Sequence, residues 1–154
     1  MSKLGMLQKK WLLLVHLLFS SIMLGGAVIF LVLSIVAANT TDASVFSACY
    51  TAMHVLSKTS VRASTIGTIV TGVLLSVWTH WGLFRYYWII AKEWLTLVAI
   101  VLGPIGMFMW TLPARTLPPG EGLGAMWTGI ILQIISLAAI FCLSVLKPWG
   151  KRKG

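Results

Sequence analysis

Acidic side chains are nearly absent from this sequence of 154 residues, which holds 3 Asp or Glu against 12 Lys or Arg. Charged residues of both signs make up 10% of the chain, whereas an average soluble domain has about 25%. Hydrophobic residues make up 58%. This composition excludes a disordered chain, a coiled coil and an ordinary cytosolic enzyme.

Cysteine is also scarce. Cys49 and Cys142 are the only two, and they form no C-x-x-C pair. Their spacing excludes the usual zinc and thioredoxin-like motifs and gives no support to a disulfide framework. The sequence also lacks a Ser-His-Asp set, a P-loop, an H-E-x-x-H motif and a Gly-rich dinucleotide motif, so it contains none of the common signatures of soluble enzymes.

The sequence instead contains four long stretches without a charged residue. They cover residues 11–41, 63–84, 94–114 and 122–146 and contain 31, 22, 21 and 25 residues. Each exceeds the roughly 18–20 apolar residues that a helix needs to cross about 30 Å of hydrocarbon. The sequence therefore predicts an all-α, polytopic membrane protein, with four transmembrane helices in an antiparallel bundle and a single domain, 1–154.

The predicted helices cover residues 11–38, 61–80, 89–112 and 123–146. The moderately apolar stretch 44–60 is either an interfacial helix or an extension of the second transmembrane helix. Gly103-Pro104 predicts a kink or a local weakening of the third helix. The first run is twice as long as the core of a signal peptide, which has about 7–15 residues, so we expect it to be retained as a membrane helix.

Basic residues are distributed unevenly between the two sides of this topology. With a cytoplasmic N-terminus, three lie outside (Lys58, Arg62, Arg115) and nine lie inside (Lys3, Lys9, Lys10, Arg85, Lys92, Lys147, Lys151, Arg152, Lys153). The positive-inside rule then predicts a multi-pass protein of the cell membrane with both termini in the cytoplasm. Because the basic residues lie at helix ends, the net charge of +9 indicates contact with the lipid bilayer and not with nucleic acid.

Histidine and lysine are the candidates for chemistry, because an ionisable residue at membrane depth marks a functional site by default. His16 near the start of the first helix, His80 at the end of the second and Lys92 at the start of the third should meet at the cytoplasmic end. Imidazoles from two helices of a bundle are suitable axial ligands for haem. His54 belongs to the other side, as an interfacial residue or as part of a second, outer site.

Small and polar residues form stripes along the predicted helices, which is typical of helix interfaces in membranes. One stripe is Thr68, Gly72, Ser76 and His80, and another is Ala125, Gly129, Gln133 and Ser136. Two further charged residues have more than one interpretation. Arg62 is a surface anchor or a head-group contact, and Glu93 is a helix cap or a proton-coupled carboxylate.

The order of several of these residues resembles a known superfamily. His16 is followed nine residues later by Gly25-Gly26, Arg62 precedes Thr71-Gly72, and W-x-x-x-K opens the third helix at residues 88–92. Over residues 9–105 this order is similar to the small bacterial membrane bundles that include the copper-resistance D domain, the HemJ-type protoporphyrinogen oxidases and their integral-membrane relatives. The resemblance implies a haem b site with His16 and Lys92.

The sequence also departs from the HemJ-type pattern. Arg62 stands alone where that pattern has an Arg-Arg pair, and no His follows the third helix. The resemblance therefore implies the fold and the haem site, without the oxidation of protoporphyrinogen.

These observations lead to two functional hypotheses. The first is a haem b-binding membrane protein that exchanges electrons with quinone or another membrane redox protein. Its site residues are His16 and, as second ligand, His80 or Lys92. The imidazole of His80 is neutral near pH 7 without any shift, whereas the resemblance favours Lys92. The second hypothesis is a non-enzymatic membrane subunit or a small transporter that uses the polar seam. Both are compatible with a homo-oligomer.

Overall fold

The computed structural model describes residues 5–78, 86–111 and 123–146, and all the elements in these ranges are helical. They are, in chain order, α1 (Met6–Asn39), α2 (Ala43–Leu56), the π-helix η1 (Ser57–Val61), α3 (Arg62–Trp78), α4 (Tyr87–Ile100), the π-helix η2 (Val101–Met107), α5 (Phe108–Thr111) and α6 (Leu123–Leu146). Since η1 and η2 join their neighbours without a gap, these described ranges form four spans, each long and apolar enough to cross a membrane: Met6–Asn39, Ala43–Trp78, Tyr87–Thr111 and Met126–Leu146. This confirms the predicted all-α, four-helix membrane fold.

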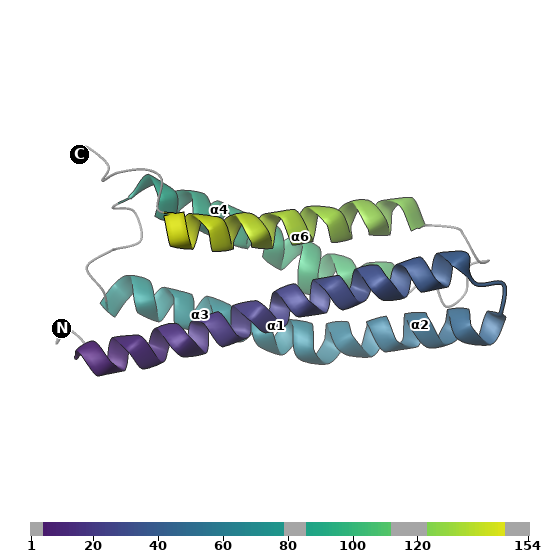
Figure 1. Ribbon diagram of the computed structural model, residues 1–154, viewed down its shortest axis with the longest axis horizontal. Coiled ribbons are helices and arrows are strands. Elements are labelled where there is room, and N and C mark those ends of the chain that lie inside the picture. Colours follow the sequence, from purple (N-terminus) through teal and green to yellow (C-terminus); the bar gives the residue numbers. More distant parts are fainter. Residues whose placement is uncertain (1–4, 79–85, 112–122, 147–154) are drawn as a thin grey trace.

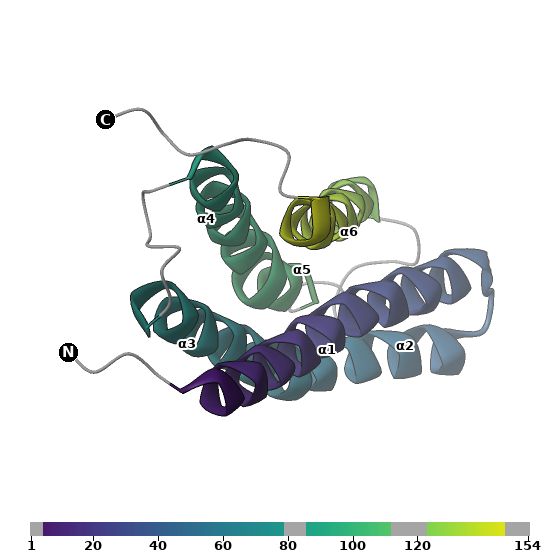
Figure 2. The same cartoon turned by 60° about the vertical axis from the view of Figure 1, so that its left-hand side comes forward.

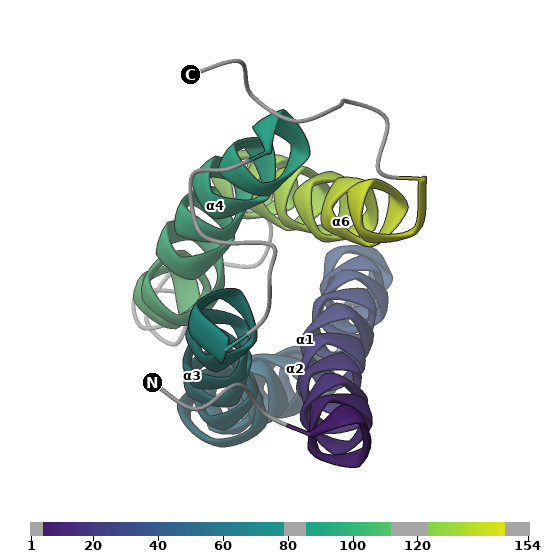
Figure 3. The same ribbon diagram turned by 90° about the vertical axis from the view of Figure 1, so that its left-hand side faces the viewer.

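Consecutive spans run in opposite directions along the bundle, so α1 begins and α6 ends on the same side (Figure 1). Seen along the bundle, the spans follow one another around a ring in the order α1, α3, α4 and α6 (Figure 3). The ring closes because α6 packs against α1 as well as against α4. The third span runs at an angle to α1, as the turned view shows (Figure 2).

The turn between the first two spans is stabilised by Asp42, which caps the first turn of α2. Its carboxylate accepts a hydrogen bond of 2.7 Å from the backbone N–H of Ser44. An N-cap aspartate satisfies one of the free N–H groups at a helix start. Hydrogen bonds from Ser44 lower the pKa of the Asp42 carboxyl, so the cap stays ionised at neutral pH.

The second span begins earlier than the sequence predicted. Instead of a helix from residue 61, α2, η1 and α3 form one continuous span, Ala43–Trp78, of 36 residues. Residues 43–66 contain neither Gly nor Pro, so nothing interrupts the helix, and Phe46, Cys49, Tyr50 and Met53 bury one face of it. Residues 44–60 therefore extend the second transmembrane helix and do not form a separate interfacial helix. At 1.5 Å per residue the span is about 54 Å long, and tilt or projection accommodates the excess over the bilayer.

The two π-helical segments, η1 and η2, pack against each other in the middle of the bundle. Pro104 lies inside η2 and has no N–H to donate, so the regular α-helical pattern cannot continue through it. The weakening predicted at Gly103-Pro104 thus takes the form of a π-helix. Gly103 also permits a close approach from the fourth span, because a Cβ at this position would lie 3.0 Å from Gln133 Nε2.

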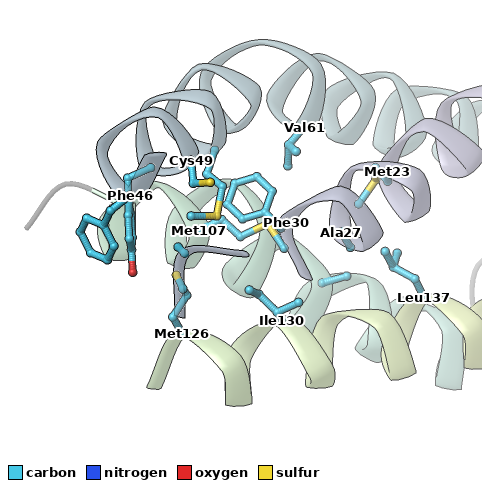
Figure 4. Close-up of a cluster of buried hydrophobic side chains, with 14 residues drawn as sticks. Met23, Ala27, Phe30, Phe46, Cys49, Val61, Met107, Met126, Ile130 and Leu137 are labelled. Atoms are coloured by element: carbon cyan, nitrogen blue, oxygen red, sulfur yellow. The ribbon is translucent and has the colours of Figure 1, made fainter. Parts of the chain in front are cut away.

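A cluster of buried apolar side chains joins the spans at the half of the bundle that contains α2. Phe30, Met53, Met107 and Ile130 come from four different spans and are at most 2% exposed. Figure 4 shows Phe30, Met107 and Ile130 facing one another across this cluster. The outer faces of the helices carry exposed Val, Ile and Leu side chains along their length, as expected for a surface that contacts lipid.

Candidate functional site

His16 is held against the second span by a direct side-chain hydrogen bond. Its Nδ1 lies 2.9 Å from the hydroxyl oxygen of Thr71 on α3. The imidazole lies against α3, since a Cβ at Gly72 would be 3.3 Å from its Cε1. The His16 side chain is therefore fixed between two helices, since Thr71 orients the ring and Gly72 leaves room for it.

The hydrogen bonds of Thr71 determine which nitrogen of His16 carries the proton. The Thr71 hydroxyl donates its only hydrogen to the carbonyl of Gly67, at 2.6 Å, so its oxygen must accept from Nδ1–H of His16. In a neutral imidazole the lone pair then resides on Nε2. A histidine oriented through Nδ1 in this way is a suitable metal ligand through Nε2.

Three more polar side chains belong to the helices at this end of the bundle, Thr68 on α3 and Lys92 and Glu93 on α4. Lys92 of α4 is near enough to His16 for the two groups to interact electrostatically, and its Nζ lies 5.7 Å from the ring centroid of Trp88. Two buried oxygen atoms at this level have no hydrogen-bond partner, Thr68 Oγ1 and Glu93 Oε1. A buried polar atom without a partner costs about 1–3 kcal/mol, so this end of the bundle offers acceptors that a bound polar group can satisfy.

The structure brings together some of the residues predicted from the sequence. His16 and Lys92 lie at the same end of the bundle, as predicted. His80, the other candidate for second ligand, lies outside the described residues. The sequence analysis missed the role of Thr71, which appears only as part of Thr71-Gly72 in the family resemblance. The predicted stripe through Thr68 and Ser76 is rotated from the most buried face of α3, which consists of Ser64, Thr65, Thr71 and Leu75.

His54 forms a second pair of the same kind at the other end of the third span. Its Nδ1 lies 3.1 Å from the hydroxyl of Thr111, the last residue of α5. That hydroxyl donates back to the carbonyls of Met107 and Phe108, both at 3.0 Å. The imidazole is 7% exposed and stacks on Phe108 with ring centroids 5.1 Å apart. His54 is therefore a buried residue of the bundle.

The fit of a haem group can be judged from the donor set at the His16 end. Within the described part of the chain, no three or more His, Cys, Asp or Glu side chains gather as a cluster that could hold a bare metal ion. Haem needs only one or two axial side chains, because the porphyrin supplies the other ligands. The oriented imidazole of His16, the neighbouring amine of Lys92 and the two unpaired oxygens fit that requirement.

Comparisons with protein-family models, with curated proteins and with solved structures find no match to this chain. The fold and the geometry of the His16 and His54 pairs therefore carry the functional argument.

Proposed function

We propose that this chain is a haem b-binding protein of the cell membrane that exchanges electrons with a quinone or another membrane redox partner. The observation that supports the proposal best is the hydrogen bond from His16 Nδ1–H to the hydroxyl oxygen of Thr71. The Thr71 hydroxyl donates its own proton to the carbonyl of Gly67. His16 would hold the iron through Nε2, and the second ligand would be Lys92 or His80. Bound haem supplies one-electron chemistry at a potential set by its ligands and surroundings.

The residues around His16 have distinct parts in this proposal. Thr71 fixes the tautomer and the orientation of the imidazole, as a hydrogen-bonded neighbour of a metal ligand usually does. Lys92 places a second basic nitrogen close to the imidazole. Thr68 and Glu93 contribute oxygen atoms that have no partner within the protein. The charge distribution of nine basic residues against three supports an orientation with this end, and both termini, on the cytoplasmic side.

The direct test of this function is the absorption spectrum of the full-length protein, purified in detergent from haem-replete cells. We expect a Soret band that shifts on reduction with dithionite. The pyridine haemochromogen spectrum then identifies the haem type and gives its amount per chain. A colourless preparation that also fails to bind added haemin would contradict the proposal.

The second candidate function is a polar conduit without a cofactor, and one feature of the bundle favours it. The buried face of the second span carries His54, Ser57, Ser64, Thr65 and Thr71. The hydroxyl groups of the serines and threonines in this set donate to backbone carbonyls of the same span. The lone pairs of these hydroxyl oxygens therefore remain available to accept hydrogen bonds. Gln133 Oε1 on the fourth span is buried and has no partner. A colourless protein would favour this function over haem binding.

The pairing of His16 with Thr71 leads to a prediction about haem affinity. Replacing Thr71 with valine keeps the shape of the side chain but removes the acceptor of the Nδ1–H bond. We expect haem to bind about 10–100-fold more weakly, as is usual when the hydrogen-bond partner of a metal-bound histidine is lost. Haemin titration of the apoprotein measures this change.

The matched control is Thr111→Val, which removes the corresponding bond from His54 at the other end of the third span. This variant should bind haem as the wild type does, and Thr71→Ser should restore most of the affinity. Equal losses in Thr71→Val and Thr111→Val would show that the effect is on folding and not on the His16 site.

A further inference from the structure

The two ends of the bundle are held together by different contacts. At the end that contains α2, the cluster of buried apolar side chains joins all four spans. Among the described residues, α3 contributes no side chain to this cluster, and α4 contributes only Ala99, near its end. The second and third spans therefore meet in apolar packing at and beyond the π-helices, on the α2 side, and not along α3.

At the His16 end the spans form two pairs. α3 packs on α1 and α4 packs on α6, whereas the described residues of α3 and α4 do not pack closely on each other, although these helices are neighbours in the ring (Figure 3). The first pair is fixed by the bond between His16 and Thr71 and by the ring of Phe19, which lies against Gly67. Lys92 of the second pair is near enough to His16 for an electrostatic interaction. A seam between α3 and α4, called the α3–α4 seam below, therefore borders the His16 site.

The seam ends at the two π-helices, where the hydrogen-bond spacing of the backbone is mixed. The N–H of Val101, at the start of η2, donates to the carbonyls of both Leu97 and Val98. At the other end of η2, the N–H of Phe108 donates to Ile105, three residues back. Between these points the π-helix pairs residues five apart, and η1 on the second span begins and ends in the same way. Spacings of three, four and five residues thus coexist, so a bend here exchanges one hydrogen bond for another.

Side chains at the π-helices help to keep the backbone bonded in a membrane, where water is not at hand. The carbonyl of Val61, the last residue of η1, accepts hydrogen bonds from the hydroxyl groups of Thr65, at 2.7 Å, and Ser64, at 3.1 Å. Bonds of this kind also tend to bend a helix. Pro104 in η2 has no N–H, so one carbonyl of the preceding turn loses its usual donor. Both π-helices are therefore suited to bending, and they bend at the same level because they pack on each other.

We propose that the third span bends at η2, against η1, so that α4 swings away from α3 and the α3–α4 seam opens to the bilayer beside His16. Lys92 lies twelve residues before Pro104, a rise of about 18 Å, so a kink of about 20° moves it by about 6 Å. The opening gives a hydrophobic molecule dissolved in the membrane a route to the His16 site. The other end stays closed, because His54 is bonded to Thr111 there. This movement goes beyond the proposed function and does not rest on haem.

Spin labels on the second and third spans test the movement in the full-length protein, with its two native cysteines replaced by alanine. Labels at Val73 and Trp94, the seam pair, lie on either side of the α3–α4 seam. Labels at Val55 and Met109, the control pair, lie on the same two spans beyond the π-helices, and all four native side chains are exposed. Double electron–electron resonance in lipid nanodiscs measures both distances. We expect two distances about 5 Å apart for the seam pair, because Trp94 is ten residues from Pro104, and one distance for the control pair.

Pro104→Ala tests whether the movement takes place at the π-helices. Alanine restores the backbone N–H and lets regular helical bonding continue through η2. We expect the share of the longer seam-pair distance to fall severalfold, whereas an unchanged control-pair distance shows that the fold is kept. The matched control is Ser34→Ala, which removes a buried hydroxyl that donates to the carbonyl of Leu31, at 2.7 Å, within the unbroken helix α1. This variant should leave both distributions as they are in the wild type.

Three results would overturn the proposal. One is a single seam-pair distance in the wild type, as narrow as that of the control pair. Another is an unchanged share of the longer distance in Pro104→Ala, and the third is an equal effect of Ser34→Ala. The samples contain no haem, so these outcomes are separate from the test of the proposed function.

Discussion

His16→Ala is expected to abolish the Soret band of the purified protein, the largest effect predicted for any single substitution in this chain. The imidazole is the side chain at this end whose proton position is fixed by a hydrogen bond to a neighbouring span, 2.9 Å from Thr71. Alanine removes the proposed iron ligand and also leaves the Thr71 hydroxyl oxygen without its donor. The measurement is the haem content per chain, from the pyridine haemochromogen spectrum.

His54→Ala is the matched control for this experiment. His54 makes the same bond to a threonine, at 3.1 Å, but lies at the other end of the third span. Thr71 follows His54 by seventeen residues on the continuous second span, a rise of about 26 Å. His54→Ala should therefore keep its haem. Full haem retention in His16→Ala, or equal loss in both variants, would contradict the assignment of the site.

The same spectrum decides between the two candidates for the second ligand. If Lys92 binds the iron, Lys92→Ala changes the spectrum and His80→Ala does not, and the opposite result identifies His80. Lysine needs its amine neutral to act as a ligand, which a site with little water favours. An imidazole with its ordinary pKa of about 6.5 is already largely neutral near pH 7.

Gly129→Ala is expected to be the most destabilising small substitution in the bundle. A Cβ at this position would overlap Cη2 and Cζ3 of the Trp110 ring. The Trp110 ring is also close to Gly106, where a Cβ would lie 3.0 Å away, so it has little room to move. Overpacking of this kind costs about 1–3 kcal/mol, which lowers the melting temperature of a chain this long by about 2–12 °C.

Thermal unfolding in detergent measures this effect, and Gly25→Ala is its control. A Cβ at Gly25 meets nothing within 4 Å, and alanine favours a helix over glycine by about 0.5–1 kcal/mol. Gly25→Ala should therefore be neutral or slightly stabilising. The double variant Gly129→Ala/Trp110→Leu should recover most of the lost stability, because the shorter side chain vacates the space. A melting temperature unchanged by Gly129→Ala alone would refute this account of the contact.

Sequence alone determined where the membrane spans lie in the chain. A charged side chain in hydrocarbon costs free energy wherever it occurs, so a long stretch without charge marks a span without any knowledge of the packing. Four charge-free runs predicted four helices, and the fourth predicted range, 123–146, agrees with α6, Leu123–Leu146. The stripe through Gly129, Gln133 and Ser136 was also correct, since all three are buried. Small residues on an otherwise apolar membrane helix allow close approach of a neighbouring helix, and polar residues form hydrogen bonds across that contact, so both types mark the packed face.

Tertiary structure alone decided which faces of the helices meet. Lipid is as apolar as the bundle interior, so hydrophobicity does not fix the rotation of a membrane helix about its axis. The hydrogen bond between His16 and Thr71, next to Gly72 of the predicted stripe, follows from the packing of α1 on α3. Likewise, His54 is buried because α5 brings Thr111 and Phe108 against it. Residues 54 and 111 are 57 positions apart, and no local pattern in the sequence connects them.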